Sequence, residues 1–298
     1  MITPTDAKKL PGPPGMTNIL AAPIEADGTK RSLGPFAVVG HVTMSPVSPG
    51  ALPVDADVRA HPHIGLTAIS YVLEGAITHR DSLGNRQELR PGDLGATVSG
   101  RGMVHSERFE RLRLLGGGLE MFQLLLALPD DEQDGEPRFF HRSHHEQISG
   151  GATVRWLFPC PPAAPAGMPI TAPILLANVA LAPDARWLVP EVEERAFYVL
   201  AGEVEVGETR VRAGQVAVLE PREATVRANE PAQLLAFGGT SVGPRYMWWN
   251  YMHSSLERIE AAKADWRQGR IKLPAGDTES FTPCPPDDGR PLVHLNPR

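Results

Sequence analysis

Apolar and polar residues alternate or cluster over short runs through most of the chain, a pattern typical of β-strands rather than helices. In the first half, these runs predict strands at residues 36–42, 67–73, 74–80, 94–98 and 103–107. In the second half they predict strands at residues 153–158, 173–181, 196–200, 203–206, 216–219, 224–226 and 234–238. Between the two sets, the apolar run Leu119–Leu128 is too short for a membrane span and predicts a buried strand.

The two halves of the chain also resemble each other. The segment Tyr71–Gly75 returns as Tyr198–Gly202, and each copy precedes an alternating strand and then a turn. The separation is that of a domain rather than of a short repeat, and 298 residues suit two domains. We therefore expect two β-barrel domains. The acidic segment Pro129–Gly135 predicts their junction, which gives domains at residues 1–135 and 136–298.

One helix is predicted near the end of the chain. Ser254 and Glu257 have the spacing of a capping box, in which Ser254 is the N-cap. Apolar residues then recur at helical spacing, at Leu256, Ile259, Ala262 and Trp266. Gly269 suits the end of this helix. The polar, Pro-rich residues from Pro274 onward are predicted to be loosely held, and the Pro/Ala-rich residues 159–169 to form a surface loop.

Composition and charge narrow the functional classes. The chain is 42% apolar and 21% charged, which indicates a globular protein. A formal net charge of -6 argues against direct nucleic-acid binding, and Arg108, Arg111 and Arg113 are interrupted by acidic residues, so we expect them on a solvated face. Two isolated cysteines, Cys160 and Cys284, do not make a disulfide framework. With neither a signal-peptide pattern nor a membrane span, we expect a cytoplasmic location.

Four residues on two short strands form the candidate site. His61 and His63 are two residues apart, so on a strand they share one face, about 6.6 Å apart along the chain. His105 and Glu107 repeat this spacing, although either pair alone is a weak signal. Three imidazoles and a carboxylate inside one barrel would be costly to bury without a cation. We therefore predict that His61, His63, His105 and Glu107 bind a divalent metal ion.

The other histidines give weaker signals. His79 has no paired ligand in its strand, and we expect it to make a hydrogen bond. His141, His144 and His145 cluster near the predicted junction, where a solvated or packing role is favoured over a second metal site. The second half contains no His-x-His pair, so we expect no metal there.

Several stretches resemble the pirin family of bicupin proteins, and together they cover nearly the whole chain. In the first half these stretches are His61–Gly65, Tyr71–Gly75, His79–Asn85, Pro91–Asp93 and Gly100–Glu107. In the second half they are Phe197–Gly202, Gly243–Asn250 and Asp265–Arg270. The resemblance implies an all-β fold of two cupin domains, which are jelly-roll-type β-barrels, packed together with a short C-terminal α-helix. It also implies metal in the N-terminal barrel only.

The same resemblance assigns the family's metal ligands to His61, His63, His105 and Glu107, with iron as the usual metal. Imidazole and carboxylate ligands also suit Ni, Mn, Co and Zn, so the residue types leave the metal open and the resemblance favours Fe(II). Four protein ligands of an octahedron leave two positions for water, substrate or dioxygen.

Two departures from many relatives bear on the substrate pocket. Ile64–Thr67 stands where many relatives have Arg-Gly-Phe-Glu, directly after the second ligand. Leu125 stands where many relatives have Trp, two residues after Gln123. Both changes leave the ligands intact but alter the residues expected near an open metal position, and pocket shape decides what binds there.

Three functions remain open at this point. The resemblance implies a quercetinase-type dioxygenase acting on a small aromatic, flavonol-like substrate, with Glu107 as both ligand and catalytic base. The alternative is a non-enzymatic regulatory protein whose metal senses redox state and which binds a transcription factor or a metabolic enzyme. A third, weaker hypothesis is a cupin isomerase acting on a small sugar, for which the sequence offers no phosphate-binding loop.

Overall fold

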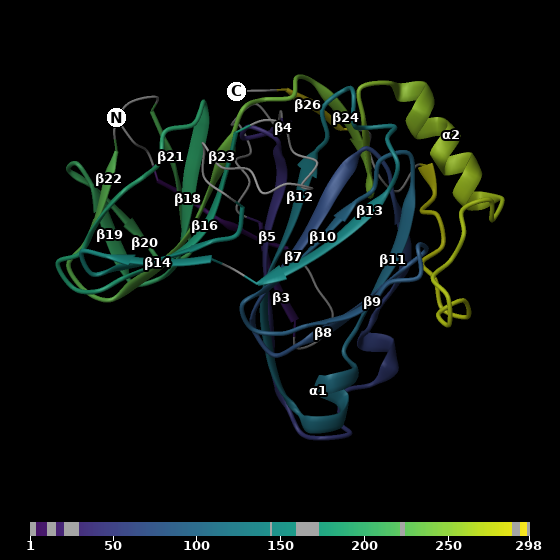
Figure 1. Cartoon of the computed structure of the whole chain (residues 1–298), viewed down its shortest axis with the longest axis horizontal. Helices are drawn as coiled ribbons and strands as arrows, with labels where there is room; N and C mark the ends of the chain where they lie inside the picture. The colour runs from purple at the N-terminus through teal and green to yellow at the C-terminus, as the bar shows by residue number, and fades with distance from the viewer. Residues whose placement is uncertain are drawn as a thin grey trace.

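Two β-barrels lie side by side, and a small sheet with a helix packs against the first of them (Figure 1). The computed structural model describes residues 4–10, 16–20, 30–143, 145–158, 173–220, 224–287 and 293–296. The predicted all-β fold of two barrels with a C-terminal helix is confirmed. Cys160, His144 and the predicted loop at residues 159–169 lie outside the described residues.

The first barrel is a sandwich of two antiparallel sheets. Its larger sheet has seven described strands in the order β13 (Arg138–Ser143), β10 (Asp93–Val98), β7 (Leu66–Glu74), β12 (Gly117–Ala127), β5 (Phe36–Val47), β3 (Met16–Leu20) and β2 (Lys8–Leu10). Its smaller sheet has the order β6 (Val58–His63), β11 (Met103–Arg108), β8 (Ile77–Asp81) and β9 (Arg86–Leu89). The predicted metal ligands lie on β6 and β11, which are neighbours in the smaller sheet.

The second barrel repeats this arrangement. Its larger sheet has the order β1 (Thr5–Asp6), β21 (Gln215–Leu219), β18 (Glu194–Ala201), β23 (Ala232–Gly239), β16 (Ile174–Leu181), β15 (Ala152–Trp156) and β14 (His145–Ser149). Its smaller sheet has the order β17 (Arg186–Leu188), β22 (Thr225–Ala228), β19 (Glu203–Val206) and β20 (Thr209–Arg212). Each strand therefore has a counterpart in the first barrel, so that the resemblance between Tyr71–Gly75 and Tyr198–Gly202 reflects equivalent strands.

A third sheet joins three strands of the C-terminal region to one short strand from the N-terminal part of the chain. It has the order β25 (Tyr251–His253), β24 (Arg245–Trp248), β26 (Val293–Asn296) and β4 (Lys30–Arg31). Helix α2 (Leu256–Arg267) follows β25, while the short helix α1 (Glu110–Leu115) and a 3-10 turn (Val54–Ala56) lie at the opposite end of the first barrel (Figure 1). Across the described residues, no helix is long and apolar enough to cross a membrane.

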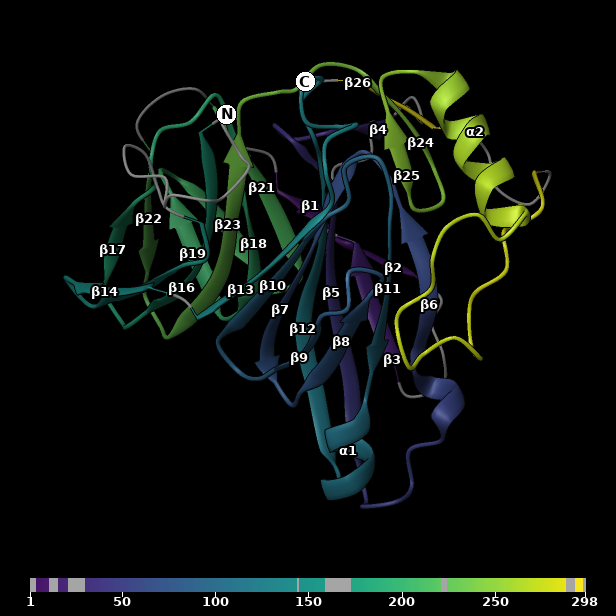
Figure 2. The same cartoon turned by 45° about the vertical axis from the view of Figure 1, so that its right-hand side comes forward.

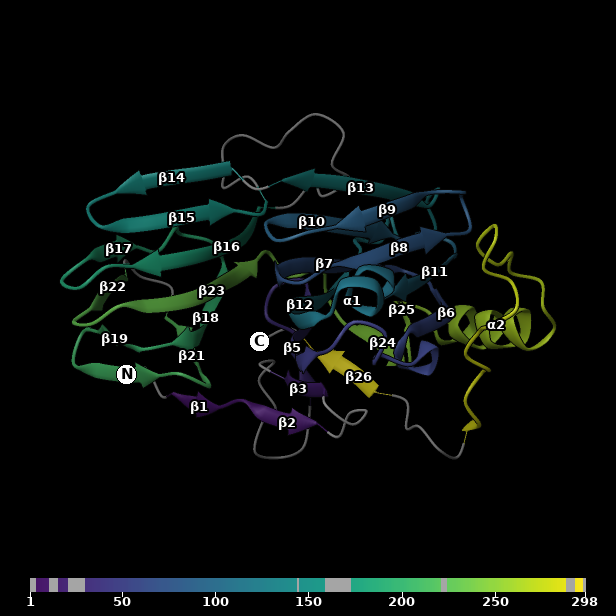
Figure 3. The same cartoon turned by 90° about the horizontal axis from the view of Figure 1, so that it is seen from below.

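Strands cross between the barrels at both edges of the large sheets (Figure 3). β13 lies after the predicted junction at residue 135, yet it pairs with β10 of the first barrel, and β14 then enters the second. In the same way β1 pairs with β21 of the second barrel, while β2 pairs with β3 of the first. Residues 138–143 and 5–6 thus belong to sheets that the predicted division does not assign to them.

Helix α2 begins one residue later than predicted. Its N-cap is Ser255, whose hydroxyl accepts from the backbone N–H of Arg258. Ser254 is engaged elsewhere, because its hydroxyl and its backbone N–H both bond the side-chain amide of Gln133. The predicted end is confirmed: Gly269 has a φ of 65°, which suits glycine, and it closes the helix.

The three arginines after Glu107 do not share the solvated face that was predicted. Arg108 is buried and pairs with Asp277, and Arg113 pairs with Asp57 at 2.7 Å, while Arg111 is exposed. Asp277 and Ser280, which follow Pro274, are correspondingly held in place rather than loose, since they contact this part of β11. The sequence pattern around Arg108 cannot reveal a partner so distant in the chain.

The seven-stranded sheets of the two barrels pack face to face. One buried cluster contains residues from both, among them Phe36, Ile69, Tyr71, Phe122 and Leu124 from the first barrel and Leu176, Ala196, Tyr198, Leu235 and Phe237 from the second. A polar contact crosses the same interface, where the Tyr198 hydroxyl lies 3.2 Å from His41 Nδ1 and His41 Nε2 lies 2.8 Å from the Glu120 carboxylate. Burial raises the pKa of Tyr198 to about 12, so this hydroxyl stays neutral.

The packing at this interface predicts how a large-to-small substitution changes the free energy of unfolding. Phe237→Ala removes a fully buried ring whose centroid lies 5.6 Å from that of Phe36. We expect the free energy of unfolding to fall by about 3–5 kcal/mol, because the cavity lies between two packed sheets. Leu114→Ala, at a side chain that is 74% exposed, should change it by less than about 0.5 kcal/mol. Equal urea midpoints for the two variants would contradict this account of the interface.

Candidate metal centre

The interior of the first barrel contains a polar layer between two apolar ones. Along β7, Leu66 and Ala68 belong to one apolar cluster and Val72 belongs to another, with Ser70 between them. The polar layer contains His61, His63, Ser70, His79, Thr97, His105, Glu107 and Gln123, from both sheets of the barrel. The predicted site residues therefore lie inside one barrel, at the level where its core is hydrophilic.

Three of the four predicted ligands converge. In the β6–β11 pair, His105 lies opposite His61, and Met103 lies opposite His63. Nε2 of His105 is 2.9 Å from Nε2 of His63 and 2.9 Å from Nε2 of His61. Two nitrogens that each bind one ion at about 2.1 Å, at right angles, lie about 3.0 Å apart. The observed spacing therefore fits three imidazoles that share one ion.

The outer nitrogens of two of the three rings have partners that direct Nε2 inward. Nδ1 of His61 lies 2.8 Å from the carbonyl oxygen of Arg59, so Nδ1 carries the proton and Nε2 keeps its lone pair. Nδ1 of His105 lies 3.4 Å from the Thr97 hydroxyl. Nδ1 of His63 is buried without a hydrogen bond of ordinary geometry, although the nearby Asn250 backbone acts to raise its pKa.

The three rings cannot satisfy one another. A neutral imidazole Nε2 offers either one proton or one lone pair, yet His105 Nε2 faces two other Nε2 atoms at hydrogen-bond distance. Because His61 also keeps its Nε2 lone pair, at most one of the two contacts can be a hydrogen bond. A single cation would satisfy all three lone pairs, and neutral imidazole is a common ligand of divalent transition metals.

Burial keeps the rings neutral. Loss of solvation is the largest effect on all three, and it holds the pKa of His63 and of His105 well below the ordinary 6.5, with the neighbouring histidines adding to it. The pKa of His61 is also lowered by burial, but less, because the Arg59 carbonyl and the Glu107 charge oppose the shift. His61 is the partly exposed member of the group, so the side of the cluster nearest solvent lies there.

Glu107, the fourth predicted ligand, lies in the same layer but outside the group of three. The ligand atoms that lie within 4.8 Å of one another are those of the histidines. The buried Glu107 carboxylate instead accepts a 2.6 Å hydrogen bond from the Ser70 hydroxyl. Its charge acts on His61, so the two groups are close. Metal ligation by Glu107 stays a prediction.

His79 makes the hydrogen bond expected of it. Its Nε2 lies 3.1 Å from the Asp81 carboxylate, and its ring stacks on Phe139 with centroids 4.0 Å apart. The His79 ring is also 5.4 Å from that of His105, and in the β8–β11 pair His79 lies opposite Glu107. His79 therefore forms a wall of the polar layer, and β13 reaches across to hold it through Phe139.

The second barrel has no such layer among its described residues. β22 lies between β17 and β19, as β11 lies between β6 and β8. Where Glu107 pairs with His79, Val226 pairs with Val206, and both valines belong to the apolar core cluster of the second barrel. Of the histidines near the junction, His141 lies 3.4 Å from Asp93 and joins no metal-binding group of described residues.

The departures at Ile64–Thr67 and Leu125 lie beside the polar layer. Leu66 and Leu125 join the apolar cluster that Met252 covers, next to Ser70 and Gln123 along their strands. Ile64 packs outside this cluster, against Trp248 and Tyr251. The departures therefore make the neighbourhood of the site apolar without touching the three converging nitrogens.

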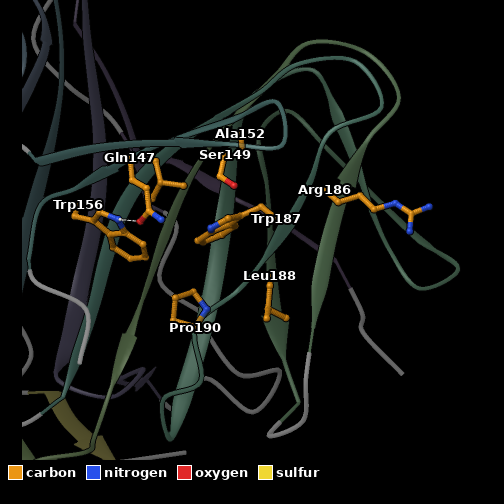
Figure 4. Close-up of a pocket in the computed structure, with 9 residues that line it drawn as sticks. Gln147, Ser149, Ala152, Trp156, Arg186, Trp187, Leu188 and Pro190 are labelled. Atoms are coloured by element: carbon orange, nitrogen blue, oxygen red, sulfur yellow. Dashed lines mark hydrogen bonds between the residues drawn. The ribbon is translucent and has the colours of Figure 1, made fainter. Parts of the chain in front are cut away.

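A separate cavity of about 260 Å³ opens on the second barrel, between β14–β15 and β17. Trp156 and Trp187 line it, and Nε1 of Trp156 donates to the Gln147 side chain at 3.2 Å (Figure 4). Arg186 extends away from it. The cavity contains none of the histidines, so it lies apart from the candidate metal centre.

Comparisons with known proteins agree with the division of the chain into two barrels. Residues 19–126 match the Pirin domain family, and residues 176–272 match the Pirin C-terminal cupin domain family. A pirin-like protein of Caulobacter vibrioides is 39% identical over 261 residues, which cover 86% of this chain and 90% of that protein. The chain belongs to the pirin family. A Pseudomonas aeruginosa protein that is provisionally named quercetin 2,3-dioxygenase is 31% identical to this pirin over 274 residues, 86% of this chain and 83% of that protein.

Solved structures share the fold. The crystal structure of a quercetin 2,3-dioxygenase from Acinetobacter baumannii has a TM-score of 0.83 and 23% identity, covering 96% of this pirin and 95% of that chain. A bacterial pirin from Escherichia coli in complex with nickel(II) has a TM-score of 0.62 and 17% identity, covering 81% and 99%. At these identities the likeness shows the fold alone.

Several residues around the centre were not predicted from the sequence. Ser70 could have been noticed, because it is a polar residue in the middle of the buried run Thr67–Leu73. Thr97 and Asp81 carry no comparable signal, and Asn250 lies in the other half of the chain. Their roles depend on strand pairing, which brings them to the histidines.

The shifted histidines make a pH prediction for the metal-free protein. Below pH 6.5, the ordinary pKa, the unfolded chain binds more protons at these three rings than the folded chain does. The free energy of unfolding should therefore fall as the pH drops below 6.5 and level off above it. Urea unfolding at about pH 7.5 and about pH 5.5 measures the difference. His63→Leu should show a smaller fall, and an identical slope in that variant would refute the assignment.

Proposed function

We propose that this pirin binds one divalent metal ion through His61, His63 and His105, with Glu107 as the fourth ligand, and that it acts as a flavonol dioxygenase of the quercetin 2,3-dioxygenase type. The observation that carries the proposal is the convergence of three Nε2 atoms whose lone pairs one cation would satisfy. Fe(II) is the proposed metal, with Ni, Mn, Co or Zn as alternatives, and the nickel(II) complex of the Escherichia coli pirin keeps nickel among them. The quercetin 2,3-dioxygenase names of relatives support the reaction class.

The chain's own residues would handle the substrate proton. A bound divalent ion would supply Lewis acidity that lowers the pKa of a flavonol hydroxyl. Glu107 is the proposed base for that proton, because its carboxylate is buried in the same layer and close to His61. Ser70 donates to Glu107 at 2.6 Å and would orient its carboxylate. A Glu107 held by Ser70, rather than within the histidine group, suits a ligand that can leave the metal to act as a base.

The surroundings favour a flat apolar ligand. Leu66, Ala68 and Leu125 belong to the apolar cluster directly beside the polar layer. His61 is the partly exposed ligand, so a substrate would approach from its side. Apolar walls beside a few convergent polar groups are typical of sites for small aromatic molecules. Dioxygen, the second substrate, would contribute both of its atoms to the product.

Ligand variants test the site. We expect His61→Ala to weaken metal binding by at least about 100-fold, since loss of a residue that only orients a ligand already costs 10–100-fold. Glu107→Ala should lose flavonol turnover and bind metal more weakly. His141→Ala, at a histidine that contacts Asp93 instead, should match the unsubstituted protein in both. Elemental analysis gives the metal content, and unchanged content in both His61→Ala and Glu107→Ala would reject the ligand assignment.

A turnover assay tests the reaction. The protein is purified without oxidant, loaded with Fe(II) or with one of the alternative metals, and mixed with quercetin and dioxygen. Flavonol loss and oxygen uptake that rise in proportion to metal occupancy support the dioxygenase. Full occupancy without turnover with any of these metals would reject quercetin as the substrate and favour either the redox-sensing regulatory protein or an unknown substrate.

A further inference from the structure

The outer face of the ligand-bearing strands is covered by the end of the chain. Because side chains alternate along a strand, Ala60, Val104 and Ser106 point away from the barrel interior that His61 and His105 enter. Ala60 and Val104 pack with Trp266 of helix α2 in one buried cluster. The segment that follows α2, residues 270–282, runs along the same face of β6 and β11 (Figure 2). We call this segment the C-terminal strap.

The strap bonds the backbone of β6 directly before the first ligand. The Ala60 N–H donates to the Ser280 carbonyl at 3.2 Å, and the Thr282 N–H donates to the Ala60 carbonyl at 2.8 Å. The register of β6 against β11 shifts at this point, because His105 pairs with His61 whereas Glu107 pairs with Val58. The strap thus supplies hydrogen-bond partners for the backbone N–H and carbonyl of Ala60, next to the irregularity in β6.

The strap also contacts β11, through the carboxylate of Asp277. Asp277 accepts hydrogen bonds from the Ser106 hydroxyl and from the Arg108 guanidinium, whose Nε lies 2.9 Å from it. Ser106 lies between His105 and Glu107 in the sequence. The Arg108 side chain is 8% exposed and that of Asp277 11%, so the pair is largely shielded from solvent. Burial alone would raise the pKa of Asp277, but the bonds from Arg108 and Ser106 outweigh it and hold the pKa below its usual range.

We infer that Asp277 is a positioning residue of the metal centre, which fixes His105 and Glu107 on β11 relative to His61 on β6 from outside the barrel. The strap joins the two strands through a different set of bonds from those of the sheet itself. Asp277, through which the strap contacts β11, is 171 residues from Ser106 in the chain. The inference rests on the proposed metal binding.

Asp277→Asn tests the inference in the full-length chain. The asparagine side chain has nearly the same shape as aspartate, but its NH2 group cannot accept the hydrogen bonds that Ser106 and Arg108 donate. The contact between the strap and β11 is therefore weakened. With Co(II) as the probe, we expect about tenfold weaker binding, a faster loss of cobalt to a chelator and a changed visible spectrum of the bound ion. Asp287→Asn is the matched control, because Asp287 pairs with Arg267 and Lys263 of α2 and should leave all three readouts unchanged.

The outcomes separate the two proposals. A lower melting temperature of Asp277→Asn with unchanged cobalt affinity and spectrum would overturn the positioning role and leave a structural one. If Asp277→Asn fails to fold, Ser106→Ala removes a single anchor bond, and unchanged cobalt readouts in that variant would equally overturn it. Loss of cobalt in His61→Ala but not in Asp277→Asn or Ser106→Ala rejects the positioning role alone. An unsubstituted protein that binds neither cobalt nor any other of the proposed metals rejects both proposals.

Discussion

Three imidazole nitrogens meet inside a barrel, with that of His105 lying 2.9 Å from each of the other two, and they cannot all be satisfied by hydrogen bonds. The first barrel is built around this constraint. Each outer nitrogen must be held so that each inner one keeps its lone pair. Arg59 does this from the same strand and Thr97 from the opposite sheet, whereas the outer nitrogen of His63 has no hydrogen bond of ordinary geometry and lies near the backbone of Asn250 in the C-terminal region. The ligands therefore draw on three separate parts of the fold, and the barrel's polar layer exists where they meet.

The second barrel shows what the same strand order does without that constraint. Val226 and Val206 occupy the register positions of Glu107 and His79, and both belong to the apolar core cluster of that barrel. Such a core holds together by packing and needs no ion. Its large sheet then packs on that of the first barrel, so the second barrel adds buried apolar area next to a domain whose own interior is partly polar. Duplication thus permits one copy to carry chemistry while the other contributes stability.

Much of the fold and part of the candidate site could be predicted from the sequence, because these features depend on residues that are close together in the chain. Alternating and apolar runs located many of the longer strands, although short ones such as β9, β17 and β20 were not predicted. The spacing of His61 with His63 placed two rings on one face. The predictions that were wrong depend on distant partners. Arg108 is buried because it pairs with Asp277, and Ser254 is not the N-cap because its hydroxyl accepts a hydrogen bond from Gln133. No pattern within a short window encodes which remote segment covers a strand, so neither contact was predictable.

The contacts at the C-terminal end also change what counts as the functional unit. Gly65, with a φ of 65°, lies so close to the Met252 carbonyl oxygen that a Cβ there would stand 1.9 Å from it. The turn after His63 is therefore shaped to receive the C-terminal region, and glycine is required because any side chain would push that region away. Since Asn250 lies in the same region and the strap continues from it to Ala60, the first barrel cut at the end of its own strands would lack part of its support. Strands β6 and β11, which carry the three histidines, are completed by the last part of the chain, so the first barrel and the C-terminal region form one structural unit around the candidate site.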